Sequence, residues 1–222
     1  MTHPRPYDPN QRGVVELSSC DSVAVLTFSE QPQYPRLSRE MLAELSDRFH
    51  AVRSSGGFRG VVIAANSHSF VTGAELREVA DLSGVAAFEF ARLGQSLFRE
   101  IARSALPVVA AIRGFCLGGG LDLALACHER VAAYDASLGY PAAALGLVTG
   151  WGGTRRLPGC VGPGVALQIM ATGERVPATQ ALTMGLVDEL APSIDLVSAA
   201  AGRARRAAQE SGRERAFLGS RD

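Results

Sequence analysis

The sequence contains no lysine, and all 22 of its basic residues are arginine. A phosphate-binding P-loop places a lysine after its last glycine, so the chain has no such loop. The dinucleotide-binding pattern G-x-G-x-x-G is not completed either, because Leu123 stands where the third glycine would follow Gly118 and Gly120. Neither kind of nucleotide loop is predicted.

The chain also lacks an excess of charge and a long apolar run. Its 22 acidic residues balance the 22 basic ones, and no basic block precedes the C-terminal region, so nucleic acid is not predicted as a partner. No apolar run reaches the length of a membrane span, and the first 13 residues, MTHPRPYDPNQRG, have no apolar signal-peptide core. We therefore expect a soluble cytoplasmic protein with no membrane partner.

Cysteine is scarce, and the spacing of the four cysteines does not suit a metal site. Two of them, Cys116 and Cys127, lie within an apolar segment. Buried free thiols in a reducing compartment are expected, and no metal is predicted. The four are Cys20, Cys116, Cys127 and Cys160.

A glycine-rich stretch, Val108–Cys127, runs from an apolar strand through a glycine cluster into an apolar helix. The first N–H groups of such a helix lack partners within the helix and attract negative charge, which suits an oxyanion hole. Asp122 lies three residues after Gly119, so the two share one helix face. The alternative is a tight strand-to-helix turn that only packs closely.

Strands alternate with helices along the chain, which predicts a mainly parallel α/β fold, and 222 residues suffice for one sizeable core. Ser38 is expected to cap the first helix, which ends near Ser54–Gly57. The tail from Ser211 to Asp222 is expected to fray. Strands are predicted at Val14–Leu17, Val23–Phe28, Gly60–Ala64, Val108–Ile112, Arg130–Ala133 and Leu138–Tyr140. Later helices are predicted at Val85–Arg103, Leu121–Cys127, Val165–Thr172, Thr179–Met184 and Ile194–Gln209.

Four motifs together resemble the crotonase (enoyl-CoA hydratase/isomerase) superfamily, in the family's order over roughly Val14 to Leu196. The motifs are FVTGAEL (Phe70–Leu76), AIRGFCLGGGLDL (Ala111–Leu123), GWGGTRRLP (Gly150–Pro158), and ATGE (Ala171–Glu174) with ATQALTMGLVD (Ala178–Asp188).

The resemblance implies a spiral of ββα units, the ClpP/crotonase fold, with two roughly perpendicular sheets. From the residues themselves, we expect a flexible lead (1–12) and a frayed tail; between them we expect a spiral core (13–196) and a short C-terminal helix (with its tail, 197–222). According to the resemblance, this C-terminal part is shorter than in relatives. The resemblance also implies a homotrimer, or a hexamer made of two trimers. The expected substrate is a coenzyme A thioester, with no permanently bound cofactor.

The resemblance also assigns a catalytic site. In the family, two backbone N–H groups polarise the thioester carbonyl, and here they belong to Ala74 and Gly119. Family hydratases use two glutamates; the first position is Asp122 here and the second is Ala142, which cannot exchange protons. The implied activity is that of an enoyl-CoA hydratase/isomerase of fatty acid metabolism. Isomerisation, decarboxylation or other enolate chemistry, and non-catalytic acyl-CoA binding stay open as alternatives.

Several residues near these motifs are candidates for substrate binding or for the missing acid. The missing glutamate could be replaced by Tyr140, Thr149 or His68. Otherwise we expect Tyr140 to pack in a strand, Thr149 to make a hydrogen bond within its loop, and His68 to face the solvent. Arg77 resembles a basic residue that contacts the nucleotide part of coenzyme A, with Arg36 ranked below it. The predicted substrate-binding set is Thr72, Gly73, Arg77, Gly118, Tyr140, Thr149 and Trp151.

Three other side chains have simpler interpretations. Glu75 is expected to be a structural partner near a helix start, and His128 to favour the negative end of a helix dipole. Trp151 is expected to pack near the acyl pocket or beneath the loop, with core packing as the simplest role.

Overall fold

The computed structural model describes residues 15–29, 34–66 and 68–219, with side chains described up to residue 210. The predicted lead at 1–12 lies outside these residues. The described chain forms a six-stranded and a three-stranded sheet. In order across it, the larger sheet contains β1 (Val15–Cys20), β2 (Val23–Phe28), β3 (Gly60–Ala65), β4 (Val108–Ile112), β6 (Glu129–Ala133) and β9 (Glu189–Ala191). The smaller sheet contains β5 (Phe115–Leu117), β7 (Ser137–Gly139) and β8 (Val176–Pro177).

Pairing in the larger sheet is parallel except between β1 and β2. The strands β2, β3 and β4 are buried along their whole length, which explains their continuous apolar sequences. The prediction that the first strand ends at Leu17 is wrong. Ser18, Ser19 and Cys20 continue β1 and pair with β2, and the chain turns at Asp21, whose φ is 53°.

The first helix, α1 (Arg39–Ser55), begins and ends as its sequence predicts. The Ser38 hydroxyl accepts a hydrogen bond from the Met41 amide at 3.1 Å, and Gly56 closes the helix with φ 65°. The further helices are α2 (Leu76–Ala80), α3 (Gly84–Ala102), α4 (Gly119–Ala126), the 3₁₀ helix η1 (Pro141–Leu145), α5 (Gly153–Val161), α6 (Pro163–Thr172), α7 (Ala178–Thr183) and α8 (Leu196–Gly219).

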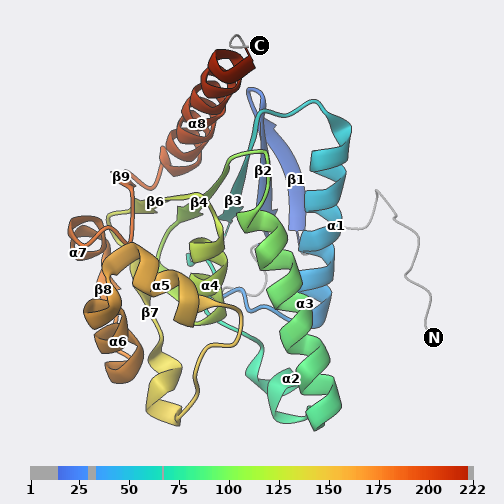
Figure 1. Ribbon diagram of the computed structural model, residues 1–222. Coiled ribbons are helices and arrows are strands. Elements are labelled where there is room, and N and C mark those ends of the chain that lie inside the picture. Colours follow the sequence, from blue (N-terminus) through green and yellow to red (C-terminus); the bar gives the residue numbers. More distant parts are fainter. Residues whose placement is uncertain (1–14, 30–33, 67, 220–222) are drawn as a thin grey trace.

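Helix α8 is longer than expected. The predicted end at Gln209 is wrong, because the backbone continues as a helix to Gly219. Alanine and arginine, both strong helix formers, make up much of this segment, and it contains no proline, so the helix continues through Gly202 and Gly212. Figure 1 shows α8 projecting beyond the sheet.

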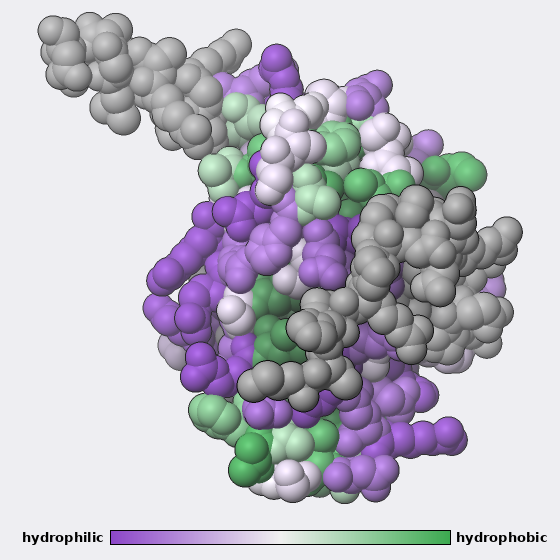
Figure 2. All heavy atoms as spheres, turned by 90° about the vertical axis from the view of Figure 1, so that its right-hand side faces the viewer, coloured by the Kyte–Doolittle hydropathy of each residue, from purple (hydrophilic) through white to green (hydrophobic). Residues whose placement is uncertain are grey.

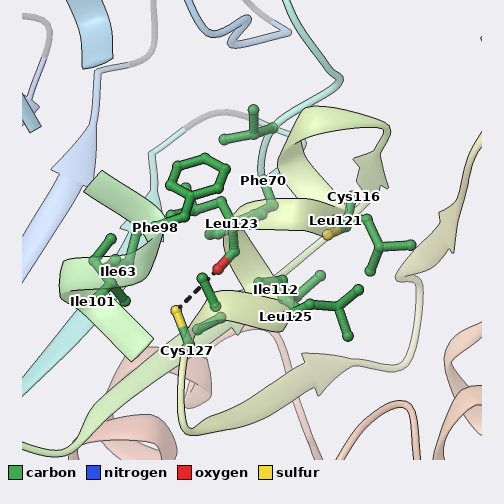
Figure 3. Packing of buried hydrophobic residues seen from close by; sticks show 14 of the residues in the cluster. Ile63, Phe70, Phe98, Ile101, Ile112, Cys116, Leu121, Leu123, Leu125 and Cys127 are labelled. Atoms are coloured by element: carbon green, nitrogen blue, oxygen red, sulfur yellow. Dashed lines mark hydrogen bonds between the residues drawn. The ribbon is translucent and has the colours of Figure 1, made fainter. Parts of the chain in front are cut away.

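The larger sheet separates two apolar layers. On one face, Val62, Val109 and Val131 pack with Leu196 and Ala200 of α8. The other face packs against α1, α3 and α4 in the main core. Figure 3 shows that core around α4, where the Cys127 thiol donates a hydrogen bond to the Leu123 carbonyl at 3.4 Å.

The surface that carries α1 and α3 is mainly hydrophilic, and hydrophobic residues gather at its lower end, where α2 and the start of α3 lie (Figure 2). Exposed apolar side chains in these two elements are Leu76, Val85 and Phe88. No helix among the described residues is both long and apolar enough to cross a bilayer.

We predict that Gly120→Ala destabilises the protein by about 1–3 kcal/mol, because a methyl group at Gly120 in α4 would overlap the backbone carbonyl of Val71. Urea-induced unfolding measures the change. Gly159→Ala is the matched control, since Gly159 also lies in a helix but has open space around it. Equal stability of the two variants would contradict the proposed close packing.

Candidate active site

Two backbone segments far apart in the sequence meet at the start of α4. A Cβ placed on Gly118 would lie 3.6 Å from the Gly73 Cα, and one placed on Gly119 would lie 3.6 Å from the Ala74 nitrogen. The contact is fixed by a parallel bridge between Val71 and Cys116, in which the Leu117 amide donates to the Val71 carbonyl at 2.9 Å. Ala74 therefore lies beside the first turn of α4.

The amides of Ala74 and Gly119 have no backbone acceptor among the described residues. The bridge between Leu37 and Ala74 uses the Gly73 carbonyl and the Glu75 amide, so among the described residues the Ala74 N–H has no backbone acceptor. Gly119 is the first residue of α4, and the first helical bond is the one donated by Asp122 to Gly118. The Gly119 N–H is therefore one of the first four N–H groups of the helix, which have no acceptor within it.

The Asp122 carboxylate is completely buried and accepts hydrogen bonds from three groups within the described chain. The Tyr140 hydroxyl donates to Oδ1 at 2.8 Å. The Thr149 hydroxyl and the Trp151 amide both donate to Oδ2, the latter at 3.0 Å. A carboxylate has about four acceptor positions, so one position remains on Oδ1.

Burial dominates the ionisation of this site. It raises the pKa of Asp122, while the hydrogen bonds from Thr149, Tyr140 and Trp151 and the positive charge of Arg156 act in the opposite direction. Burial and the adjacent Asp122 also raise the pKa of Tyr140, which keeps its hydroxyl protonated as a donor. Asp122 is therefore a buried acid whose hydrogen-bond donors are held in fixed positions.

Tyr140 and Thr149 were predicted as candidates to bind substrate or to replace the missing acid, and the sequence did not indicate that both would bind Asp122. Their hydroxyls lie 18 and 27 residues away from it in sequence. Gly153, at the start of α5, makes room for this unit, because a methyl group there would overlap the Tyr140 hydroxyl and Asp122 Oδ1.

The position that carries the second glutamate in family hydratases has no acidic residue here. Ala142 lies in η1, and no other carboxylate acts on the pKa of Asp122 among the described residues. Nor does the described part of the chain contain a group of three or more His, Cys, Asp or Glu residues that could hold a metal ion.

Trp151 fills the space beside Gly119. A Cβ on Gly119 would lie 2.5 Å from Cζ3 of the indole, and one on Gly94 would lie 2.5 Å from its Nε1. The ring also packs edge-on against Phe90 and Phe98, with centroids 5.2 and 5.7 Å away. The expected core packing of Trp151 is confirmed, since it is buried between α3 and α4.

Around the first motif, the polar residues have mixed roles. Thr72 donates its hydroxyl to the Pro35 carbonyl at 3.3 Å. Glu75 caps α2 and lies 3.5 Å from the Arg36 guanidinium, which confirms its structural role. Arg77 is exposed, and its amide donates to the Glu75 carboxylate at 3.2 Å. His68 is exposed, as its solvent-facing interpretation required.

The prediction for His128 is wrong. Its Nδ1 accepts a hydrogen bond from the Val108 amide at 2.9 Å, and partial burial lowers its pKa. A neutral ring therefore joins two backbone segments instead of placing a cation at a helix end.

The buried free thiols of Cys116 and Cys127 are confirmed, and burial raises the pKa of Cys127 to about 12. Cys20 and Cys160 are only partly buried.

Arg156 was not singled out by sequence analysis. Its guanidinium donates to the carbonyls of Trp151 at 3.0 Å and Phe98 at 3.3 Å, and thereby joins the loop before α5 to α3. The only signal in the sequence is its position within the glycine-rich segment GWGGTRRLP, which does not distinguish it from Arg155.

Comparison with known proteins shows the family of this chain. Residues 19–220 match the family model of enoyl-CoA hydratase/isomerase. The chain is 38% identical over 178 residues to a crotonyl-CoA hydratase of Syntrophomonas wolfei, covering 80% of this chain and 68% of that protein.

Solved structures with the same fold include DspI of Pseudomonas aeruginosa, with a TM-score of 0.85 at 28% identity over 98% of this chain and 91% of that one. An enoyl-CoA hydratase of Bacillus anthracis superposes with a TM-score of 0.82 at 30% identity, covering 87% and 76% of the two chains. The chain thus has the crotonase-like α/β spiral fold. It belongs to the enoyl-CoA hydratase/isomerase family.

We predict that Tyr140→Phe raises the pKa of Asp122 further and destabilises the protein in a pH-dependent way. Since the pKa of Asp122 is already raised in the folded state, stability falls as the pH rises through that pKa, and the Tyr140 hydrogen bond limits the fall. The loss should be about 1.5–3 kcal/mol where Asp122 is ionised and should shrink as the pH falls below its pKa.

Urea unfolding at a series of pH values measures this difference. Tyr134→Phe, at a side chain that is 63% exposed, is the matched control and should show little change at any pH. A Tyr140→Phe penalty that does not vary with pH would contradict the assignment of the bond to an ionisable Asp122.

Proposed function

We propose that the protein is an acyl-CoA enzyme that stabilises a thioester enolate with the N–H groups of Ala74 and Gly119. An enolate concentrates negative charge on the former carbonyl oxygen, and fixed amide dipoles meet this charge without reorganising. The observation that carries the proposal is the position of the Ala74 nitrogen beside the first turn of α4, 3.6 Å from where a Cβ of Gly119 would lie. Gly73 and Gly118 give the thioester close access to these amides, since neither carries a Cβ.

Asp122 is the proposed acid/base. Its Oδ1 retains one acceptor position, and its raised pKa makes it a stronger base than an exposed aspartate. Thr149, Tyr140 and the Trp151 amide hold the carboxylate in one orientation. In the proposed reaction, Asp122 removes a proton from the α-carbon, the electron pair moves onto the thioester oxygen, and the proton then returns to a carbon of the acyl chain.

Within hydratase/isomerase chemistry, Ala142 favours reactions that need one acid. Hydration by paired carboxylates needs a second proton-exchanging group, whereas a double-bond shift or a decarboxylation needs a stabilised enolate and at most one acid/base. A decarboxylase is therefore the second candidate. We further propose that the chain acts in the cytoplasm, in fatty acid metabolism, as a trimer or hexamer, with Thr72 and Arg77 near the substrate.

We predict that Asp122→Asn lowers thioester turnover by about 10²–10⁴-fold, because the amide cannot accept the α-proton. A panel of crotonyl-CoA, other unsaturated thioesters and malonyl-type thioesters should be incubated with the protein and followed for product. Binding of the same thioesters to the variant should persist.

Asp47→Asn, at an exposed position of α1, is the control and should retain full turnover. Binding without product across the whole panel by the unmodified protein would overturn the enzymatic proposal in favour of a non-catalytic acyl-CoA-binding protein. Undiminished turnover by Asp122→Asn would remove Asp122 from the mechanism.

We also predict that Trp151 restricts the enzyme to short acyl groups, since its indole occupies the space beside Gly119. Trp151→Ala should raise kcat/KM for a medium-chain thioester relative to a four-carbon one by roughly tenfold or more. Trp151→Phe, which keeps most of the aromatic packing, should change the ratio of the two kcat/KM values less. If the unmodified protein and both variants had the same ratio, Trp151 would not restrict acyl-chain length.

A further inference from the structure

A concave site lies between α3 and the loop that leads into α5. It is a cleft of about 460 Å³, a size typical of small-molecule sites. Its charged lining consists entirely of arginine, and no carboxylate lines it among the described residues. The four arginines are Arg99, Arg103, Arg155 and Arg156.

Most of the positive charge of the cleft has no acidic partner within the described chain. None of its four arginines takes part in a salt bridge there. The acidic residue beside Arg99, Glu100, pairs instead with His50 at 2.6 Å and Arg53 at 3.9 Å on α1. The Arg156 guanidinium is fixed by hydrogen bonds to two carbonyls, and the buried Asp122 carboxylate acts on its charge. The other three arginines of the cleft have no acidic partner among the described residues.

Uncharged hydrogen-bond donors also face the cleft. Helix α5 begins at Gly153 without a side-chain cap, so its first amides and its positive dipole end adjoin the cleft at Gly152 and Thr154. The Thr154 side chain is exposed and supplies a hydroxyl. Arg99 lies in the last turn of α3 and Arg103 is the residue that caps this helix, four positions later, and both line the cleft.

We propose that this cleft binds a ligand with a diphosphate group. Planar guanidinium groups pair with phosphate oxygens through two parallel hydrogen bonds, and four of them match the charge of adjacent phosphates better than that of a single carboxylate. Trp151 lines the cleft and also packs against Gly119, so the cleft adjoins the amide site with the indole as a shared wall. The proposal does not depend on thioester turnover.

The test is the binding of inorganic pyrophosphate to the full chain at physiological salt, followed by calorimetry and by tryptophan fluorescence. Trp151 is the only tryptophan in the sequence and lines the cleft, so its emission responds to binding there, and calorimetry with the arginine variants assigns the response to the cleft. Saturable binding is expected, with the Kd raised at least tenfold in Arg99→Gln/Arg103→Gln. Both side chains are exposed, so the double variant should fold normally.

Arg92→Gln is the matched control, because Arg92 is an exposed arginine of α3 that lies over Phe88 instead of in the cleft. It should bind pyrophosphate as the unmodified protein does. No saturable heat or fluorescence change, or equal Kd values for the double variant and Arg92→Gln, would overturn the proposal.

Competition with coenzyme A identifies the source of the diphosphate. If coenzyme A displaces pyrophosphate and the double variant weakens both, the cleft holds the diphosphate of coenzyme A itself. If both bind at once, the cleft holds a separate diphosphate compound. Neither arm involves turnover, so failure of this proposal is distinguishable from failure of the enolate mechanism.

Discussion

The structure of the site depends on one buried carboxylate. Asp122 has no exposed surface, and a charge in such a place is tolerated only when its oxygens are hydrogen-bonded. Its three donors come from separate parts of the chain: Tyr140 after β7, and Thr149 and Trp151 before α5. The same bonds that offset the burial of the charge also hold these segments against α4. Stability and chemistry are therefore coupled at one residue.

The second constraint is the space that glycine leaves. At Gly119, Gly120 and Gly153 a methyl group would overlap an indole ring, a backbone carbonyl, or the Tyr140–Asp122 pair. Each glycine lets a neighbouring segment approach α4 more closely than any other residue would permit. The segment that contains Val71 and Ala74 therefore lies against α4, and Tyr140 reaches the Asp122 carboxylate of α4. Trp151 closes the space beside Gly119 on the side of α3.

Local patterns in the sequence predicted much of the fold. The helix capped by Ser38 and the strand Val108–Ile112 formed as expected, because cap chemistry and continuous apolar runs are local signals. The ends of β1 and α8 were misjudged, since pairing with β2 extends a polar strand and helix propensity carries α8 past Gln209. Asp122 was found from its position after the glycines. Its bonds to Tyr140 and Thr149 were not, because they join residues that only the tertiary fold brings together.

The central claim is that two backbone amides and one carboxyl group contact the same thioester. A crystal structure of the protein with a saturated short-chain acyl-CoA tests this claim most directly. The account predicts the thioester oxygen about 3 Å from the nitrogens of both Ala74 and Gly119, with Asp122 Oδ1 facing the α-carbon. A thioester oxygen that contacts neither amide, or an α-carbon turned away from Asp122, would contradict it.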